Sequence, residues 1–205
     1  MADTPITLQQ LFENGFGIVT VFNAKLYSLA QGKKYIATED LTVQHFNTTE
    51  NSEVLDTLKI ANLTMEGPTK TITGGQYANP IIKYGKTMTL EMQDALGRST
   101  TMTKFFGCEY TSDGDLIVGD KFPPAFALEG ETFFIDRTTG NKEKVFIFIP
   151  QILPDALLSL TQDAEGDATV FDLNGTVCIS RVGGKDIFYR ISRTSFFPTQ
   201  ESEQN

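Results

Sequence analysis

The sequence predicts a mainly β protein, built as an antiparallel sandwich or barrel with one short helix and one long loop. Two observations lead to this prediction. Short apolar segments rich in β-branched and aromatic residues recur along the 205 residues, separated by clusters of turn-forming residues. Only one segment, 94–106, has a helical pattern. Regular strands with so little helix are typical of β-sandwiches and barrels. The length fits one domain, 1–205.

The first half of the chain contains three segments with strand character: 16–22, 41–46 and 87–93. The third is the clearest, because Met88, Leu90 and Met92 alternate with polar residues, as in a strand with one buried face. Ahead of them, residues 1–14 predict an N-terminal arm.

A long polar loop is predicted at 46–57, FNTTENSEVLDT, which has no periodic pattern. A connection of this length within a compact β domain is usually functional or reaches a neighbouring subunit. The predicted helix follows at Asp94, a good N-cap residue, and it is expected to be short because Gly97 and three threonines weaken it.

Hairpins dominate the second half. Segments 131–136 and 142–150 flank a loop with Gly140 and Asn141, where a positive φ costs little. Two further strand segments flank the acidic stretch 163–167, and 186–192 predicts a last strand. The polar residues 198–205 predict a flexible tail.

The strand segment 142–150 is apolar on both faces. Val145, Ile147 and Ile149 point one way, whereas Phe146 and Phe148 point the other. Because one face of an antiparallel sheet often meets water, two explanations remain open. The strand lies at the centre of a sandwich under a helix, or another subunit packs on it.

Charge and composition exclude several classes of protein. The net charge of −9 and pI near 4.6 argue against a protein that grips nucleic acid through its phosphates. Segment 57–104 carries a formal charge of +3 and segment 109–172 carries −9. Such a molecule can attract its own copies head to tail, although independently solvated loops explain the pattern equally well.

A soluble intracellular protein is expected. Cys108 and Cys178 lie far apart and suggest no disulfide framework. The N-terminal residues have no signal-peptide pattern. The densest apolar run, 145–153, is too short to span a membrane.

The sequence offers little support for catalysis. Segment 65–77, MEGPTKTITGGQY, differs from a phosphate-binding loop because Pro68 precedes Lys70 and the paired glycines follow it. His45 is the only histidine, so no histidine pair exists for a metal or a proton relay. The sequence therefore predicts no enzyme and no cofactor. A weak cation site at Asp163, Glu165 and Asp167 is the minor alternative to a polar hairpin tip.

Two stretches resemble a known family. Residues 56–97 contain a Leu/Lys strand, then E-G-P-T-K, T-G-G, Asn-Pro and the strand YGKTMTLEMQDAL. Residues 126–152 and 158–173 contain a strand ending in Ile-Pro, an acidic glycine hairpin and a Val-Phe strand. This order resembles the major tail, or tail tube, structural proteins of tailed bacteriophages and prophages. The resemblance extends to other virion proteins of that fold, such as tail-completion, distal-tail and head-decoration proteins.

The resemblance implies a β-sandwich or barrel of the tail-tube type with a flanking helix and an extended loop. It implies homo-oligomeric rings, usually hexamers, that stack head to tail into a tube through which DNA passes without specific binding. Further implied partners are the tape measure and tail terminator proteins, and the implied location is the virion tail, assembled in the host cytoplasm. A ligand- or Ca²⁺-binding β-barrel module is the alternative from another class. The predicted subunit interface comprises Asn47, Thr48, Thr49, Glu50, Asn51, Ser52, Phe146 and Phe148.

Overall fold

The computed structural model describes most of the predicted domain. The described residues are 16–18, 21–48, 53–55, 58–67, 69–71, 81–83, 85–94, 102–103, 106–120, 122–136, 140–155, 160–161 and 170–197. The predicted N-terminal arm 1–14, the cation-site alternative at 163–167 and the tail 198–205 lie outside them. No described helix is long and apolar enough to cross a membrane.

The protein is mainly β and every described strand pair is antiparallel, as the sequence predicts. The large sheet contains β1 (Phe16–Ile18), β2 (Phe22–Ser28), β3 (Glu53–Leu55), β4 (Leu58–Glu66), β7 (Thr87–Asp94), β10 (Phe126–Asp136), β11 (Lys142–Pro154), β12 (Leu160–Thr161), β13 (Val170–Val177) and β16 (Arg190–Ser192). Three separate hairpins are formed by β5 (Thr69–Thr71) with β6 (Ile81–Lys83), β8 (Glu109–Tyr110) with β9 (Leu116–Ile117), and β14 (Ser180–Val182) with β15 (Lys185–Ile187).

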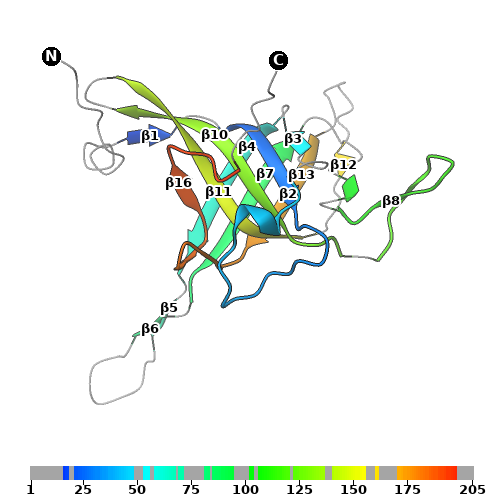
Figure 1. Ribbon diagram of the computed structural model, residues 1–205, viewed down its shortest axis with the longest axis horizontal. Helices are drawn as coiled ribbons and strands as arrows, with labels where there is room; N and C mark the ends of the chain where they lie inside the picture. Colours follow the sequence, from blue (N-terminus) through cyan, green and yellow to red (C-terminus); the bar gives the residue numbers. More distant parts are fainter. Residues whose placement is uncertain are drawn as a thin grey trace.

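The long β10–β11 hairpin forms the centre of the large sheet, whose strand order is β3-β2-β10-β11-β13-β7-β4 (Figure 1). At its turn end this hairpin pairs instead with β1 and β16. Leu26 of β2 belongs to the same buried cluster as Met88 of β7, although β10, β11 and β13 separate these strands in the sheet. The sheet therefore curls around an interior. Among the described residues its end strands, β3 and β4, do not pair with each other, so no closed barrel is described.

The interior face of the sheet forms the larger core. Met88, Leu90 and Met92 of β7 are buried there, which confirms the alternation predicted for this strand. Leu173 of β13 lies directly opposite Met92 and is also buried. Burial of such side chains stabilises a fold by about 1.5–3 kcal/mol each.

The outer face of β2, β10 and β11 carries a second, aromatic core. The Phe148 ring stacks on Phe196, with centroids 4.0 Å apart, and meets the edges of Phe46 and Phe197. Tyr27 of β2 stacks on Phe197. The strand β11 is thus covered on both faces, and the cover on this side is the chain's own segment after β16 rather than a helix.

Two of the predicted strands differ in the structure. The predicted strand 41–46 is wrong, because Val43–His45 forms a 3-10 helix, η1. The Thr42 backbone N–H donates to His45 Nδ1 over 3.1 Å, and this local contact outweighs the strand-like composition. The predicted strand 186–192 is two strands, β15 and β16, that lie in different sheets.

The predicted loop 46–57 is shorter than expected at both ends. Phe46 is buried and forms a β-bridge with Leu29. Glu53–Leu55 forms β3, which pairs with β2 and buries Leu55. Between these ends, only residues 47–48 are described.

The predicted helix is described only near its end. Met102, Thr103 and Phe106 have helical backbone, and Met102 and Phe106 are buried. Gly107 follows with φ of 64° and donates its N–H to the Thr103 carbonyl, the arrangement that commonly ends a helix. The start of the predicted helix lies outside the described residues.

Candidate assembly surfaces

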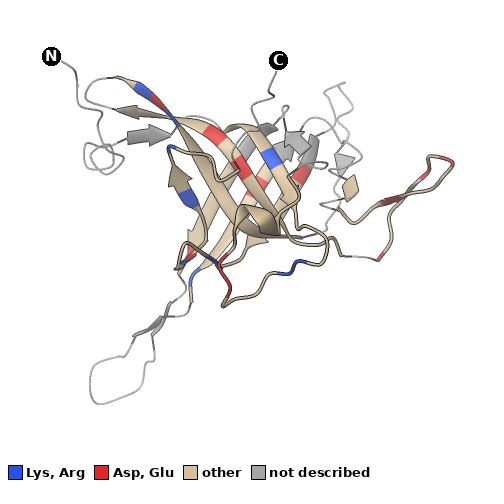
Figure 2. Ribbon diagram, in the orientation of Figure 1, with Lys and Arg blue, Asp and Glu red and all other residues tan. Residues whose placement is uncertain are grey.

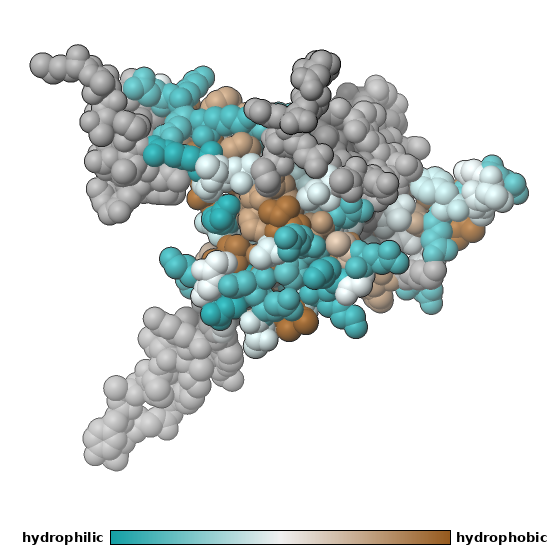
Figure 3. Space-filling model, viewed as in Figure 1, coloured by the Kyte–Doolittle hydropathy of each residue, from teal (hydrophilic) through white to brown (hydrophobic). Residues whose placement is uncertain are grey.

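The β8–β9 hairpin leaves the body of the protein as an arm. Its two strands pair only with each other among the described strands, and the hairpin extends to the right in Figure 1. We define this arm as residues 109–122. Its exposed apolar side chains are Tyr110, Leu116, Ile117, Val118 and Phe122, the last 84% exposed. Hydrophobic side chains are visible on the arm at the right of Figure 3.

Hydrogen bonds among residues 111–115 fix the conformation of the tip of the arm. The Gly114 N–H donates to the Thr111 carbonyl over 3.1 Å, and Gly114 has φ of 92°, which glycine adopts at little cost. The Asp115 N–H donates to Thr111 Oγ1 over 3.0 Å, and Thr111 and Asp115 also form a backbone bond. These contacts form a polar hairpin tip at Asp113–Asp115. A preorganised tip lowers the entropy cost of binding a partner.

The arm is also strongly acidic. Residues 109–122 contain four acids, Glu109, Asp113, Asp115 and Asp120, and one base, Lys121. Figure 2 shows only acidic colouring on this hairpin. Asp113, Asp115 and Asp120 are exposed and form no salt bridge with another described residue. The arm therefore combines uncovered apolar surface with negative charge.

The edge strand β4 is a second uncovered surface. Among the described strands it pairs with β7 only, with Leu63 opposite Leu90 and Met65 opposite Met88. Paired residues point to the same face of a sheet, so Leu63 and Met65 continue the row of the buried interior residues. Both are nevertheless exposed. An edge with free backbone groups and exposed apolar side chains is a template for pairing with another strand.

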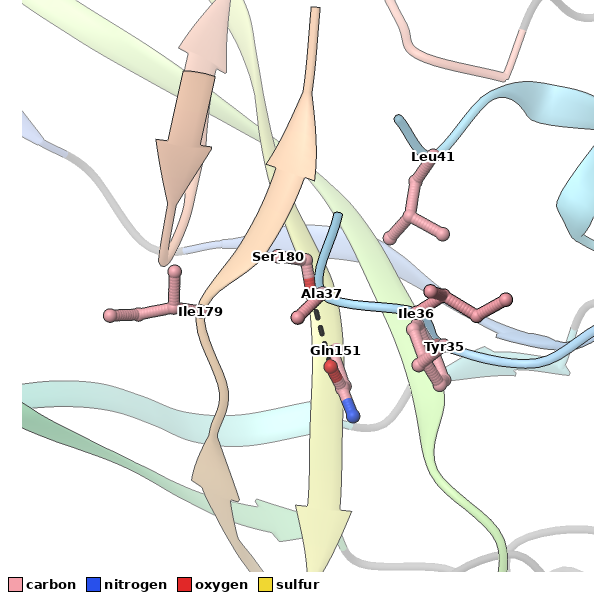
Figure 4. A pocket seen from close by; sticks show the side chains of 7 residues that line it. All are labelled: Tyr35, Ile36, Ala37, Leu41, Gln151, Ile179 and Ser180. Atoms are coloured by element: carbon pink, nitrogen blue, oxygen red, sulfur yellow. Dashed lines mark hydrogen bonds between the residues drawn. The ribbon is translucent and has the colours of Figure 1, made fainter. Parts of the chain in front are cut away.

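A cavity of about 220 Å³ lies between the segment before η1 and the start of β14 (Figure 4). Ile36 and Ile179 line the cavity, and they are 50% and 55% exposed. Gln151 of β11 also lines it, and Ser180 Oγ donates to Gln151 Oε1 over 3.0 Å, the dashed contact in Figure 4. Tyr35 is held in place by donating its hydroxyl to the Pro150 carbonyl.

Ser180 Oγ, Gln151 Oε1 and the Tyr35 hydroxyl are therefore already hydrogen-bonded within the chain. Burial of Tyr35 raises its pKa above the ordinary value, with a further contribution from Cys178. Tyr35 thus stays neutral and cannot act as a phenolate base near neutral pH. The cavity accordingly resembles a docking site for apolar groups more than a catalytic site.

The predicted interface residues have different positions in the structure. Phe148 is 1% exposed under the chain's own aromatic residues, so it is removed from the candidate interface. Phe146 is half-buried on β11, and Lys144 Nζ lies 5.3 Å from its ring centre. Asn47 is half-buried, Thr48 is exposed, and Thr49, Glu50, Asn51 and Ser52 lie outside the described residues. None of the described contacts joins Phe146 to Asn47.

A buried carboxylate holds the aromatic cover in place. Glu129 of β10 accepts hydrogen bonds from Ser195 Oγ over 2.6 Å and from the Phe196 backbone N–H over 2.5 Å. Burial raises the pKa of the Glu129 carboxyl above its ordinary value, while these hydrogen bonds and the charge of Arg190 lower it. Because the partners are structural groups, Glu129 is a clamp for segment 195–197.

The described residues contain no group of three or more His, Cys, Asp or Glu side chains that could hold a metal ion. His45 Nε2 lies 3.2 Å from Glu39 Oε1, and His45 Nδ1 contacts Thr42. Its ring therefore stabilises the local turn. Asp163, Glu165 and Asp167 lie outside the described residues, so the cation alternative stays a prediction.

The sequence did not identify the arm as a candidate assembly surface. Its strands have two residues each, too short to show a period of two. A signal existed in the adjacent residues Leu116, Ile117 and Val118, an apolar run directly after the turn residues Gly114–Asp115.

Residues 109–186 match the model of the YomU/Tube protein family, a phage tail tube-type family. The match begins at the first residue of β8, so it includes the arm, and it extends through β10, β11 and β13 to β15. No curated protein matches the chain. The predicted resemblance to phage tail tube proteins is confirmed by this match, which implies a component of the virion tail.

Proposed function

We propose, on the premise of this relationship to phage tail tube proteins, that the protein is the major tail tube subunit. Copies form rings, with six subunits in the family's usual arrangement, and the rings stack head to tail around a channel for DNA. The curled antiparallel sheet and the helical residues near Phe106 are consistent with a tail-tube-type sandwich and its flanking helix. The role is structural and requires no catalysis and no cofactor.

The uncovered apolar arm is the observation that carries the proposal. A monomer gains nothing from a projecting hairpin whose Leu116, Ile117 and Val118 face water. Burying such side chains against a second copy stabilises an assembly by about 25 cal/mol per Å² of apolar surface removed from water. The family match begins at this arm, which supports its importance for the tail tube role.

The open edge of the sheet supports the same role. β4 can accept a strand from a neighbouring copy, which would satisfy its free backbone groups and cover Leu63 and Met65. If the neighbour supplies a strand other than its own β4, the contact joins unlike surfaces, and contacts of this heterologous kind close into rings or propagate as stacks.

The acidic composition supports the passage of DNA. A net charge of −9 disfavours binding to phosphates, so DNA can slide through the channel without specific contacts. The tape measure and tail terminator proteins are the further partners that this role requires. Assembly takes place in the cytoplasm of the bacterial host.

The test is negative-stain electron microscopy of the purified chain over a range of concentrations, with sedimentation velocity on the same samples. Rings or stacked tubes are expected, with the polymer fraction rising with concentration. A species that stays monomeric at every concentration, together with the absence of this chain from the tube of any virion preparation, would contradict the proposal.

A further inference from the structure

We propose that the arm of one copy docks its apolar run, Leu116–Val118, in the cavity between Ile36 and Ile179 of another copy. This inference rests on the proposed tube function and names the surfaces that meet. The first argument is complementarity of shape and polarity. The arm is a projecting apolar hairpin, and the cavity is a hollow with exposed isoleucines at its rim.

The size of the cavity fits such an occupant. A cavity of about 150 Å³ in a protein core already accepts a benzene ring, and the cavity beside Ile36 encloses about 220 Å³. One or two branched aliphatic side chains therefore fit without rearrangement. Since Ser180 Oγ already donates to Gln151 Oε1, an apolar group entering the cavity leaves these two atoms hydrogen-bonded.

Charge complementarity is the second argument. Lys33 and Lys34 immediately precede Tyr35 and Ile36, are exposed, and form no ion pair with another described residue. On the arm, Asp115 immediately precedes the apolar run and Asp120 follows it by two residues. Insertion of the run thus brings an arm with four acids and one base, Lys121, toward Lys33 and Lys34.

The acidic groups near the cavity are largely engaged within the chain. Asp40 accepts from the Gly184 N–H over 3.0 Å and lies 3.4 Å from Arg181 Nε. Glu39 Oε1 lies 3.2 Å from His45 Nε2. Asp186 lies 3.7 Å from Arg181 Nη1. The two lysines are consequently the charges most available to a partner. Exposed pairs of this kind add little affinity, but they orient the encounter.

The geometry requires two copies. The tip of the arm extends away from the segment that holds Tyr35 and Ile36 (Figure 1). The arm and the cavity are unlike surfaces on one chain, so each copy can offer an arm to one neighbour and a cavity to another. This is a heterologous contact, and its repetition generates a ring or a stack.

Site-directed cross-linking tests the contact. One chain carries Val118→Cys on the arm and the other carries Ile36→Cys at the cavity, both in a Cys178→Ser background; Cys108 is buried. The two chains are mixed and treated with a short bismaleimide. The control replaces Ile36→Cys by Lys142→Cys, an exposed position at the start of β11. Circular dichroism and sedimentation of each variant establish that it is folded and assembles.

We expect cross-linked dimers of the Val118→Cys and Ile36→Cys chains to form at least tenfold faster than with the Lys142→Cys control. Equal rates in chains that assemble would overturn the docking proposal and leave the tube function standing. Selective cross-linking in a chain that forms dimers but no rings would support the docking contact and contradict the tube function. Failure of the unmodified chain to associate at all would contradict both.

Discussion

Two hairpins of this protein have the same secondary structure and opposite surroundings. In the β10–β11 hairpin, residues of both faces are buried, because the curled sheet covers one face and the segment around Phe196 covers the other. In the β8–β9 hairpin, all four strand residues are exposed. Isolated two-stranded hairpins are marginally stable in water. The first hairpin gains its stability from its own chain, and we infer that the second gains a partner from another chain.

The largest difference in the free energy of unfolding is expected between alanine variants of two phenylalanines, Phe148 and Phe122. Phe148→Ala removes a ring that is 1% exposed and leaves a cavity among the aromatic residues. We expect the free energy of unfolding to fall by about 3–5 kcal/mol. The matched change on the arm, Phe122→Ala, is expected to alter it by no more than about 0.5 kcal/mol. Urea denaturation followed by circular dichroism measures both, and equal losses would show that the two hairpins do not differ as described.

Alanine substitutions of two glycines, Gly175 and Gly119, extend the comparison to the space around the backbone. In Gly175→Ala the new Cβ would lie 2.8 Å from the Leu153 carbonyl oxygen, a backbone atom that cannot move freely. A loss of about 1–3 kcal/mol is expected. Gly119→Ala on the arm meets no atom within 4 Å and requires no positive φ. The free energy of unfolding of the Gly119→Ala variant should equal that of wild type or exceed it by up to about 1 kcal/mol, because the substitution reduces the conformational freedom of the unfolded chain. Thermal unfolding with the same scan rate measures the difference.

The Glu129 clamp predicts a pH dependence of the covered hairpin. Burial raises the folded-state pKa of Glu129 above its ordinary value, so the folded protein binds this proton more tightly than the unfolded chain does. Ionisation of Glu129 therefore costs stability above the folded pKa, and the cost disappears as the pH falls from that pKa to the ordinary value.

We accordingly compare wild type with Glu129→Gln, which cannot ionise. The unfolding free energy of wild type minus that of the variant should rise on acidification through this window and stay flat above it. Subtraction removes the contributions of the other carboxyl groups. A difference that falls on acidification would contradict the raised pKa.

The smallest effect on stability is expected on the arm, where the effect on assembly is largest. The double variant Leu116→Ser, Ile117→Ser should unfold within about 0.5 kcal/mol of wild type, because both side chains are exposed. Its polymer fraction in sedimentation velocity should fall at least tenfold. The control is Leu153→Ser, since Leu153 and Leu116 are both 43% exposed and Leu153 lies on β11. An arm variant that polymerises like wild type would refute the role of the arm.

The covered hairpin could be predicted from the sequence, whereas the exposure of the arm could not. The strands around Gly140 and Asn141 are long enough to show alternation, and both faces of 142–150 read as apolar. What covers Phe148 could not be predicted, because the clamp joins Glu129 to Phe196, which lie 67 positions apart. Segment 41–46 was predicted as a strand because composition does not reveal the contact of Thr42 with His45. The cavity depends on residues from three distant segments, which only the folded chain brings together.

The position of the Glu129 partners near the end of the sequence has a consequence for folding during translation. Phe46 and Phe148 are translated before the residues that cover them, Ser195 to Phe197. A nascent chain that has completed β11 and β13 can therefore form the interior core while its outer aromatic face is still bare. Covering that face is the last step, and it also brings the Glu129 partners into place. Chains that terminate before Ser195 would expose a hydrophobic aromatic surface, which chaperones and proteases recognise. Such chains would not enter the pool of subunits available for assembly.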